Sequence, residues 1–300
     1  MLKIAFDKRY ILPLPEGHRF PMMKYELIPS QLLYEGIVSK ENFFSPNKIE
    51  NYWVEKAHDI EYIQKLNNLN LSRSEIRKTG FPLTKELVER EYIITKGTCE
   101  CVDFALNYGA AANIAGGTHH AFKNRGEGFC LFNDIAVASY YAMEKYNFSK
   151  ILIVDLDVHQ GNGTASIFKN EDRVFSFSMH GKKNYPFKKE NSNLDIELED
   201  GINDELYLSI LNDALKNIQK QISPEIIFYI SGVDILSTDK LGRLGVSRNG
   251  CRQRDDLVYE LARKNQIPIV TSMGGGYSEK IYDIVEAHCN TYKSMIDIIF

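Results

Sequence analysis

Short apolar runs alternate along this chain with longer segments of helical periodicity, and this alternation limits the possible folds strongly. Six runs have the length and composition of buried strands: Lys3–Phe6, Ala111–Ala115, Ile151–Asp155, Val174–Ser178, Ile226–Ile230 and Ile267–Thr271. Four segments have the spacing of amphipathic helices: Asn133–Lys145, Asn203–Gln221, Arg248–Lys264 and Ile281–Ile299. Strands that alternate with helices form parallel sheets with helices on both faces, so we expect an α/β fold with an open parallel β-sheet.

The composition is that of one globular domain. No internal repeat, low-complexity tract or flexible linker interrupts the 300 residues, so we expect a single domain over residues 1–300. A net charge of -4 gives no electrostatic basis for binding nucleic acid or an anionic membrane. No apolar run approaches the ~20 residues that span a bilayer, and Met1–Phe6 is too short for a signal-peptide core. The five scattered cysteines indicate a reducing compartment, and we expect the cytoplasm.

Four of the predicted strands are followed by glycines and polar side chains. These segments are Gly116–His120, Asp155–Gly163, Ser231–Asp234 and Gly274–Tyr277. In open parallel sheets, ligands bind at the carboxyl ends of the strands. Glycine allows a sharp turn and a close approach of the backbone to a ligand. We therefore expect the four segments to converge on one site.

Asp157 and His159 form the core of a candidate metal site. Alternate residues of an extended segment share one face, so both side chains can point at a common ion. Asp234, at the end of another strand, would supply a third ligand and leave a position for water. An imidazole with two carboxylates suits zinc or ferrous iron in an open catalytic site. A lone aspartate at a strand end is more often a turn or cap residue, but the spacing and the flanking glycines favour the metal.

His119 and His120 form a tandem pair. Neutral imidazole is the side chain best suited to move protons near neutral pH. An acidic partner would hold one ring as imidazolium, whereas an amide partner would leave the other free to act as a base. Asp155 and Asn162 could supply that contrast. The alternative is one surface and one core histidine without a role in catalysis.

Tyr277 follows three consecutive glycines. In many proteins such a tyrosine packs in the core near the start of a helix. Beside a metal ion, its hydroxyl could instead donate a hydrogen bond to a developing oxyanion. The triple glycine favours the second interpretation.

Together these motifs resemble those of histone deacetylases and their bacterial relatives, most closely the class IV branch. The matching elements are Gly116–Ala121, Gly128–Asp134, Asp155–Gly163, Gly232–Leu236 and Gly274–Tyr277. Two upstream segments, Gly17–Met22 and Gly80–Lys85, look like class IV features. The resemblance covers essentially the whole chain, with its elements in the family's order.

The resemblance implies the arginase/deacetylase fold and a metal-dependent amide hydrolase that removes acetyl or longer acyl groups from lysine side chains of proteins or peptides. Zinc, or ferrous iron, would be held by Asp157, His159 and Asp234. His120 would act as general base and then acid, His119 backed by Asp155 would be its electrostatic partner, and Tyr277 would polarise the acyl carbonyl. Asn162 stands where class I enzymes carry an aspartate, so the proton relay through His120 should resemble that of the other branches.

The resemblance also implies a substrate tunnel and a second ion. The tunnel would be lined by Gly128, Phe129, Tyr185 and Leu241. The small Gly128 beside Phe129 is compatible with a roomy tunnel, and we expect long acyl groups to be preferred over acetyl. A potassium ion would be bound by Asp155, Ser178 and the backbone carbonyls of Asp157, His159 and Met179.

Three other functions fit part of the sequence. An arginase-like ureohydrolase would need two metal ions, but Ser231–Leu236 offers a single acid. A non-catalytic acyl-lysine reader would not require every catalytic group that is present here. A deacetylase of acetylated polyamines or other small amides is the strongest alternative. The sequence leaves open the acyl length, the natural substrate, the metal used in the cell and the oligomeric state.

Overall fold

The computed structural model describes all residues, 1–300, and its centre is one sheet of eight parallel strands. The strands are β1 (Lys3–Ala5), β2 (Phe43–Phe44), β3 (Ala110–Asn113), β4 (Ile151–Asp155), β5 (Val174–Gly181), β6 (Leu194–Leu198), β7 (Ile226–Ile230) and β8 (Ile269–Ser272). Their order across the sheet is β2-β1-β3-β8-β7-β4-β5-β6. The predicted open parallel α/β sheet is therefore confirmed.

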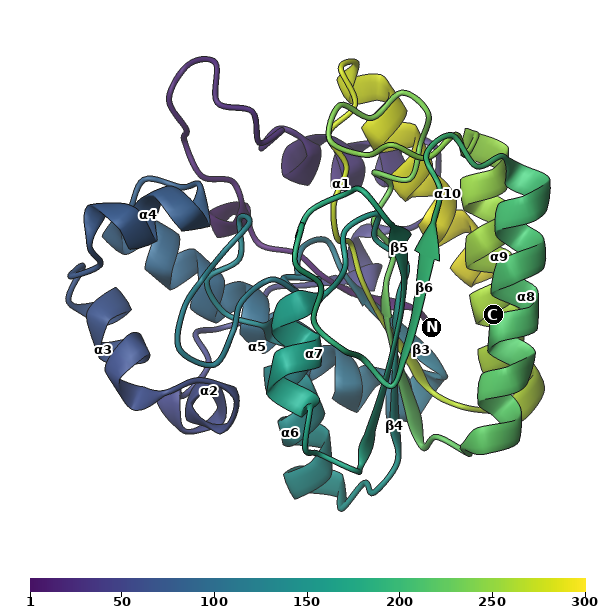
Figure 1. The fold of residues 1–300 in the computed structure, drawn as a ribbon, viewed down its shortest axis with the longest axis horizontal. Coiled ribbons are helices and arrows are strands. Elements are labelled where there is room, and N and C mark those ends of the chain that lie inside the picture. Colours follow the sequence, from purple (N-terminus) through teal and green to yellow (C-terminus); the bar gives the residue numbers. More distant parts are fainter.

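Ten α-helices surround the sheet. They are α1 (Lys24–Tyr34), α2 (Asn51–Ala57), α3 (Ile60–Asn67), α4 (Arg73–Thr79), α5 (Lys85–Tyr108), α6 (Asp134–Tyr146), α7 (Asn162–Phe168), α8 (Asp204–Gln221), α9 (Arg248–Asn265) and α10 (Ile281–Ile299), with short 3-10 turns at Lys8–Tyr10 and Lys40–Asn42. Helices α8, α9 and α10 lie on one side of the sheet, and α5, α6 and α7 lie on the other (Figure 1). None of the helices is long and apolar enough to cross a bilayer.

The predicted elements are all present, with small shifts at their ends. Strands β4 and β7 have the predicted bounds, and β5 continues three residues further, to Gly181. Asn133 and Asn203 begin two of the predicted helices. Both cap a helix, because each side chain accepts a hydrogen bond from the backbone N–H three residues on.

Several elements carry no clear signal in the sequence. Strand β6 lies at the edge of the sheet and alternates apolar residues with Asp195 and Glu197, so it lacks the continuous apolar run of a central strand. Helix α5 is largely buried, yet its inner face includes Gly97, Thr98 and Cys101. These small and weakly polar side chains obscure the apolar periodicity by which a helix is usually recognised.

The register of the central strands places their carboxyl ends at one level. Asp155 at the end of β4 pairs with Ile230 at the end of β7. Ile230 in turn pairs with Ser272 of β8, and Ser272 with Asn113 of β3. The segments that follow these four strands therefore leave the sheet side by side, as the sequence predicts for one shared site.

Candidate active site

Three metal-binding side chains converge just beyond the ends of β4 and β7. One ligand atom from each of Asp157, His159 and Asp234 lies within 4.8 Å of the others. All three residues are buried. The structure thus brings together the three residues predicted as metal ligands.

Backbone amides orient both carboxylates of this cluster. The N–H of Val158 donates to Asp234 Oδ1 at 2.9 Å, and the N–H of Gly275 donates to Asp157 Oδ2 at 2.7 Å. His159 Nδ1 lies 3.0 Å from Asp157 Oδ1 and 3.2 Å from Asp234 Oδ2. The three side chains are therefore held in place by the strand ends and loops around them.

Gly275 shows how tightly the backbone closes around the cluster. A Cβ atom at this position would collide with the carboxylate oxygens of both Asp157 and Asp234. The site thus combines two buried carboxylates, one imidazole and a loop that only glycine fits. This donor set matches a divalent ion such as zinc in an open catalytic site.

The two adjacent histidines have different partners. His119 Nδ1 lies 2.7 Å from Asp155 Oδ2, and His120 Nδ1 lies 2.7 Å from Asn162 Oδ1. Burial opposes a charge on His119, but the Asp155 and Asp157 carboxylates outweigh it and raise the pKa of His119 to about 9. Burial and the neighbouring His119 hold the pKa of His120 well below its usual value. The two rings thus have the acidic and the amide partner that the sequence suggested, and their catalytic roles stay a prediction.

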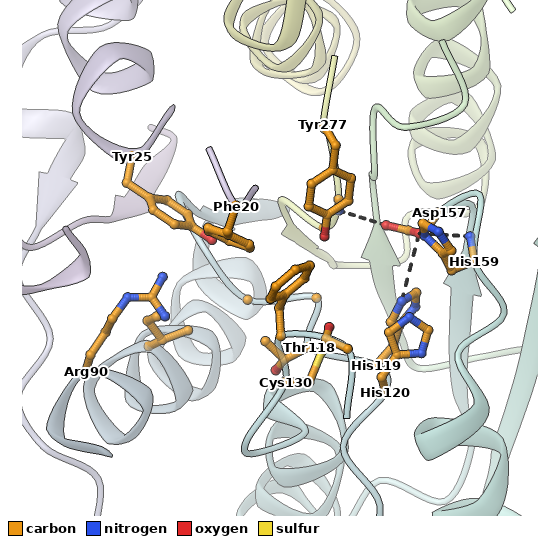
Figure 2. Close-up of a pocket in the computed structure, with 17 residues that line it drawn as sticks. Phe20, Tyr25, Arg90, Thr118, His119, His120, Cys130, Asp157, His159 and Tyr277 are labelled. Atoms are coloured by element: carbon orange, nitrogen blue, oxygen red, sulfur yellow. Dashed lines mark hydrogen bonds and ion pairs between the residues drawn. The ribbon is translucent and has the colours of Figure 1, made fainter. Parts of the chain in front are cut away.

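The hydrogen bond that His120 donates to Asn162 also fixes which nitrogen of His120 is free. The amide oxygen can only accept, so Nδ1 of His120 carries the proton. The other nitrogen, Nε2, is then unprotonated. His120 lines the pocket that also contains Asp157 and His159 (Figure 2).

Tyr277 points into the same pocket rather than into the core (Figure 2). Its ring lies 6.4 Å from the ring of His159, and its backbone N–H donates to Asp239 Oδ2 at 2.6 Å. Burial and the carboxylates of Asp157 and Asp234 raise the pKa of Tyr277 well above its usual value. The hydroxyl therefore stays protonated and can donate a hydrogen bond.

The pocket opens to solvent through a wider cavity, which we call the mouth. The mouth has a volume of about 550 Å³, and His120, His159 and Tyr277 are among its lining residues. Its walls include the four residues predicted for a substrate tunnel, Gly128, Phe129, Tyr185 and Leu241. Gly128 has a φ of +54°, and a Cβ atom there would lie 2.6 Å from Cδ2 of His120. Glycine is therefore needed for this wall to pass so close to the histidine.

Two of the predicted potassium ligands, Asp155 and Ser178, lie on the neighbouring strands β4 and β5. Asp155 pairs in register with Ser178, and both side chains are buried. Ser178 Oγ lies 2.9 Å from Nδ1 of His180. The monovalent ion, and the carbonyls of Asp157, His159 and Met179 as its ligands, stay a prediction.

Two buried cations near the site were not found by sequence reasoning. Arg254 of α9 is fully buried beside Asp255, and its guanidinium donates to the backbone carbonyls of Ser231, Gly232 and Leu156. Lys24 of α1 is also fully buried, and its Nζ donates to the Gly274 carbonyl at 3.2 Å. The available signal for Arg254 was its position three residues after Cys251, inside the buried stripe of α9.

Comparison with known proteins shows similarity to histone deacetylases over most of the chain. A family model described as the histone deacetylase domain matches residues 18–292. An uncharacterized protein of Picosynechococcus sp. is 37% identical over 98% of both chains. Histone deacetylase 2 of Arabidopsis thaliana is 30% identical, over 87% of this chain and 70% of its own length. The acetoin utilization protein AcuC of Staphylococcus xylosus is 28% identical, over 87% of this chain and 74% of its own length.

Solved structures show the same fold. The crystal structure of an HDAC homolog complexed with SAHA has a TM-score of 0.85 and 23% sequence identity, covering 98% of this chain and 83% of the other. That of an HDAC homolog from Aquifex aeolicus has a TM-score of 0.84 and 22% identity, covering 98% and 84%. With the family match over most of its length, the chain belongs to the histone deacetylase superfamily and is a hydrolase of that family.

Proposed function

We propose that this protein hydrolyses the amide bond of N6-acyl-lysine in proteins or peptides, with zinc, or failing that ferrous iron, on Asp157, His159 and Asp234. One observation carries the proposal. Asp157, His159, the free nitrogen of His120 and the hydroxyl-bearing ring of Tyr277 line one pocket that opens through the mouth. Asp234 completes the cluster beside Asp157 and His159. A long, uncharged acyl-lysine side chain could reach this pocket from outside, while the rest of the substrate stays at the mouth.

The catalytic roles follow from the partner of each side chain. The metal, when bound, would supply Lewis acidity that polarises the acyl carbonyl and activates a water molecule. His120, whose Nδ1 proton is directed to Asn162, would take the water proton on Nε2 and later give it to the departing lysine amine. His119, paired with Asp155, would contribute positive charge beside the developing oxyanion. Tyr277 would donate its hydroxyl hydrogen to that oxyanion.

The size of the pocket behind the mouth limits the length of the acyl group that it can hold. Its free volume is about 40 Å³, which is room for about three water molecules. An acetyl group has three heavy atoms, so this volume suits acetyl better than a long chain. The preference for long acyl groups expected from Gly128 stays a prediction, and it requires the pocket walls to move.

A potassium ion next to the metal is a second part of the proposal. One carboxylate oxygen of Asp155 accepts a hydrogen bond from His119, and the other accepts one from the backbone N–H of Asp157. The potassium ion would be a further partner of the same carboxylate. A cation beside Asp155 and Ser178 would fix the conformation of the segment that bears the metal ligands.

The test is a panel of lysine peptides that carry acetyl to myristoyl groups, run beside acetylated polyamines with zinc-loaded protein. We expect release of the free lysine amine and about one bound zinc per chain. Asp234→Ala should lose both the metal and the activity, whereas Asp213→Ala, at an exposed aspartate of α8, should keep both. Full hydrolysis by metal-free protein in the presence of a chelator would refute the proposal.

A further inference from the structure

The mouth is surrounded by basic side chains. Arg19, Lys78, Lys183 and Arg243 all line it, and all four are exposed. They come from four separate parts of the chain: the segment before α1, helix α4, the loop after β5 and the loop after β7. The chain as a whole has a net charge of -4, so these cations gather at the mouth against the overall charge of the molecule.

Acidic side chains neutralise these four cations only in part. Glu127 is the one acid that lines the mouth, and its two oxygens already accept from Arg125 Nε at 2.7 Å and from the Tyr185 hydroxyl at 2.6 Å. Asp200 lies 3.5 Å from both Lys183 and Arg243, so one carboxylate is shared by two cations.

The two remaining cations, Arg19 and Lys78, form no ion pair within the protein. The guanidinium of Arg19 lies over the ring of Phe129, 5.3 Å from its centroid, which places the charge at the wall of the mouth. Both groups are therefore available to an anionic partner that enters beside Phe129.

An apolar contact lies beside the cations. Phe187 also lines the mouth, and 89% of its surface is exposed. An exposed aromatic ring offers a large apolar area that a binding partner can cover. A polypeptide that presents both acidic and apolar side chains around the modified lysine would meet complementary groups at the mouth.

We propose that the mouth selects acyl-lysines that are flanked by aspartate or glutamate in a polypeptide. This inference rests on the proposed function, because it concerns the residues around the lysine whose amide is hydrolysed. Basic groups at the mouth attract acidic flanks and repel cationic ones, so they act on specificity and on the rate of association. Acetylated polyamines and lysine-rich segments carry the charge that the mouth repels.

The experiment compares three peptides with the same acyl group on the same central lysine, flanked by acidic, neutral or basic residues. Each exposed ion pair is worth a factor of about 1.4 to 5 in affinity. With several pairs, we expect kcat/KM of zinc-loaded protein to be about tenfold higher for the acidic than for the basic peptide at low salt. The ratio should shrink as salt rises, because exposed charges are screened.

Reversing two charges at the mouth tests whether the preference for acidic peptides arises there. In the double variant Lys78→Glu/Arg243→Glu the ratio of acidic to basic peptide should fall below one, with an unchanged melting temperature as evidence of folding. The double variant Lys216→Glu/Lys220→Glu, at two exposed positions of α8, changes the net charge by the same amount and should keep the wild-type ratio.

Each other result decides against the inference. An equal rate on the three peptides, or a preference for the basic one, would overturn it and leave the proposed function intact. A fall of the ratio in Lys216→Glu/Lys220→Glu as large as in Lys78→Glu/Arg243→Glu would also overturn it, since the mouth would then have no special role. If no acyl-lysine peptide is hydrolysed, the proposed function fails and this inference fails with it.

Discussion

The inner end of the pocket, which holds the cluster of Asp157, His159 and Asp234 and which we call the floor, differs from the mouth in how its side chains are held. On the floor, Asp157 and Asp234 are buried and accept hydrogen bonds from backbone amides at the ends of strands. At the mouth, Arg19 and Lys78 are exposed and form no ion pair within the protein. The side chains of the floor are thus held by hydrogen bonds in segments that directly follow strands, whereas these two cations at the mouth have no ion-pair partner.

We expect the floor to determine the reaction and the mouth to determine which substrates are preferred. Buried groups with fixed partners are costly to replace, because each substitution leaves a partner without its hydrogen bond. Exposed side chains can change at small cost in stability. We therefore expect large effects from substitutions at or beneath the floor and small ones at the mouth.

The largest effect on the free energy of unfolding should come from Arg254, which lies beneath the floor. Arg254→Met removes the cation beside the buried Asp255 and leaves the carbonyls of Ser231 and Gly232 without this donor. Breaking a buried ion pair in this way costs about 3–5 kcal/mol. We expect the free energy of unfolding in urea to fall by that amount and the zinc affinity to fall with it.

The neighbouring Arg252 provides a matched control for that experiment. It lies on the same helix, but its side chain is partly exposed and pairs with Asp297 at the surface. Arg252→Met should change the free energy of unfolding by less than about 1 kcal/mol. An equally small change for Arg254→Met would mean that the carbonyls after β4 and β7 are held without it.

A smaller but more specific effect is expected at Tyr277. Tyr277→Phe removes only the hydroxyl, which would act once the carbonyl becomes tetrahedral, so kcat should fall more than KM changes. The loss of one such donor typically costs about a hundred- to a thousandfold in rate, or roughly 3–4 kcal/mol of barrier. Zinc content and melting temperature should stay at their wild-type values.

The control for this variant is Tyr282→Phe, at an exposed tyrosine five residues further along the chain. Its turnover should equal that of the wild type. If Tyr277→Phe also turns over at that rate, Tyr277 is a packing residue and polarisation of the carbonyl belongs to the metal alone.

The smallest effect is expected at the mouth itself. Phe187→Ala removes an exposed ring, so the free energy of unfolding should change by less than about 0.5 kcal/mol. KM for a peptide substrate should rise a few-fold with kcat unchanged, because the ring would contact substrate and transition state equally. A fall in kcat comparable to that of Tyr277→Phe would remove the distinction between mouth and floor.

The sequence predicted the floor better than the mouth for a physical reason. Floor residues follow apolar strands within a few positions, and the parallel register then places them together without further information. The partners of the histidines, Asp155 and Asn162, lie within the same motif as Asp157 and were predicted with it.

The mouth could not be predicted from the sequence, because its cations come from segments that are far apart along the chain. Arg19, Lys78, Lys183 and Arg243 are separated by more than fifty residues at each step and follow no periodicity, so nothing in the sequence brings them together. Arg254 was missed because a charged residue is usually exposed. Its burial becomes evident only when the carbonyls at the ends of two strands are found to face it.

The position of β8 in the sheet affects how the chain can assemble. Strand β8 is the last strand in the sequence, yet it lies in the middle of the sheet and pairs with both β3 and β7. Without it, β1, β2 and β3 form one partial sheet and β4 to β7 form another, each with an unpaired edge. During synthesis on the ribosome, the two halves therefore cannot join until residues 269–272 have left the exit tunnel. Gly275, whose N–H donates to the Asp157 carboxylate, follows directly, so the pocket cannot be complete before this late part of the chain is in place.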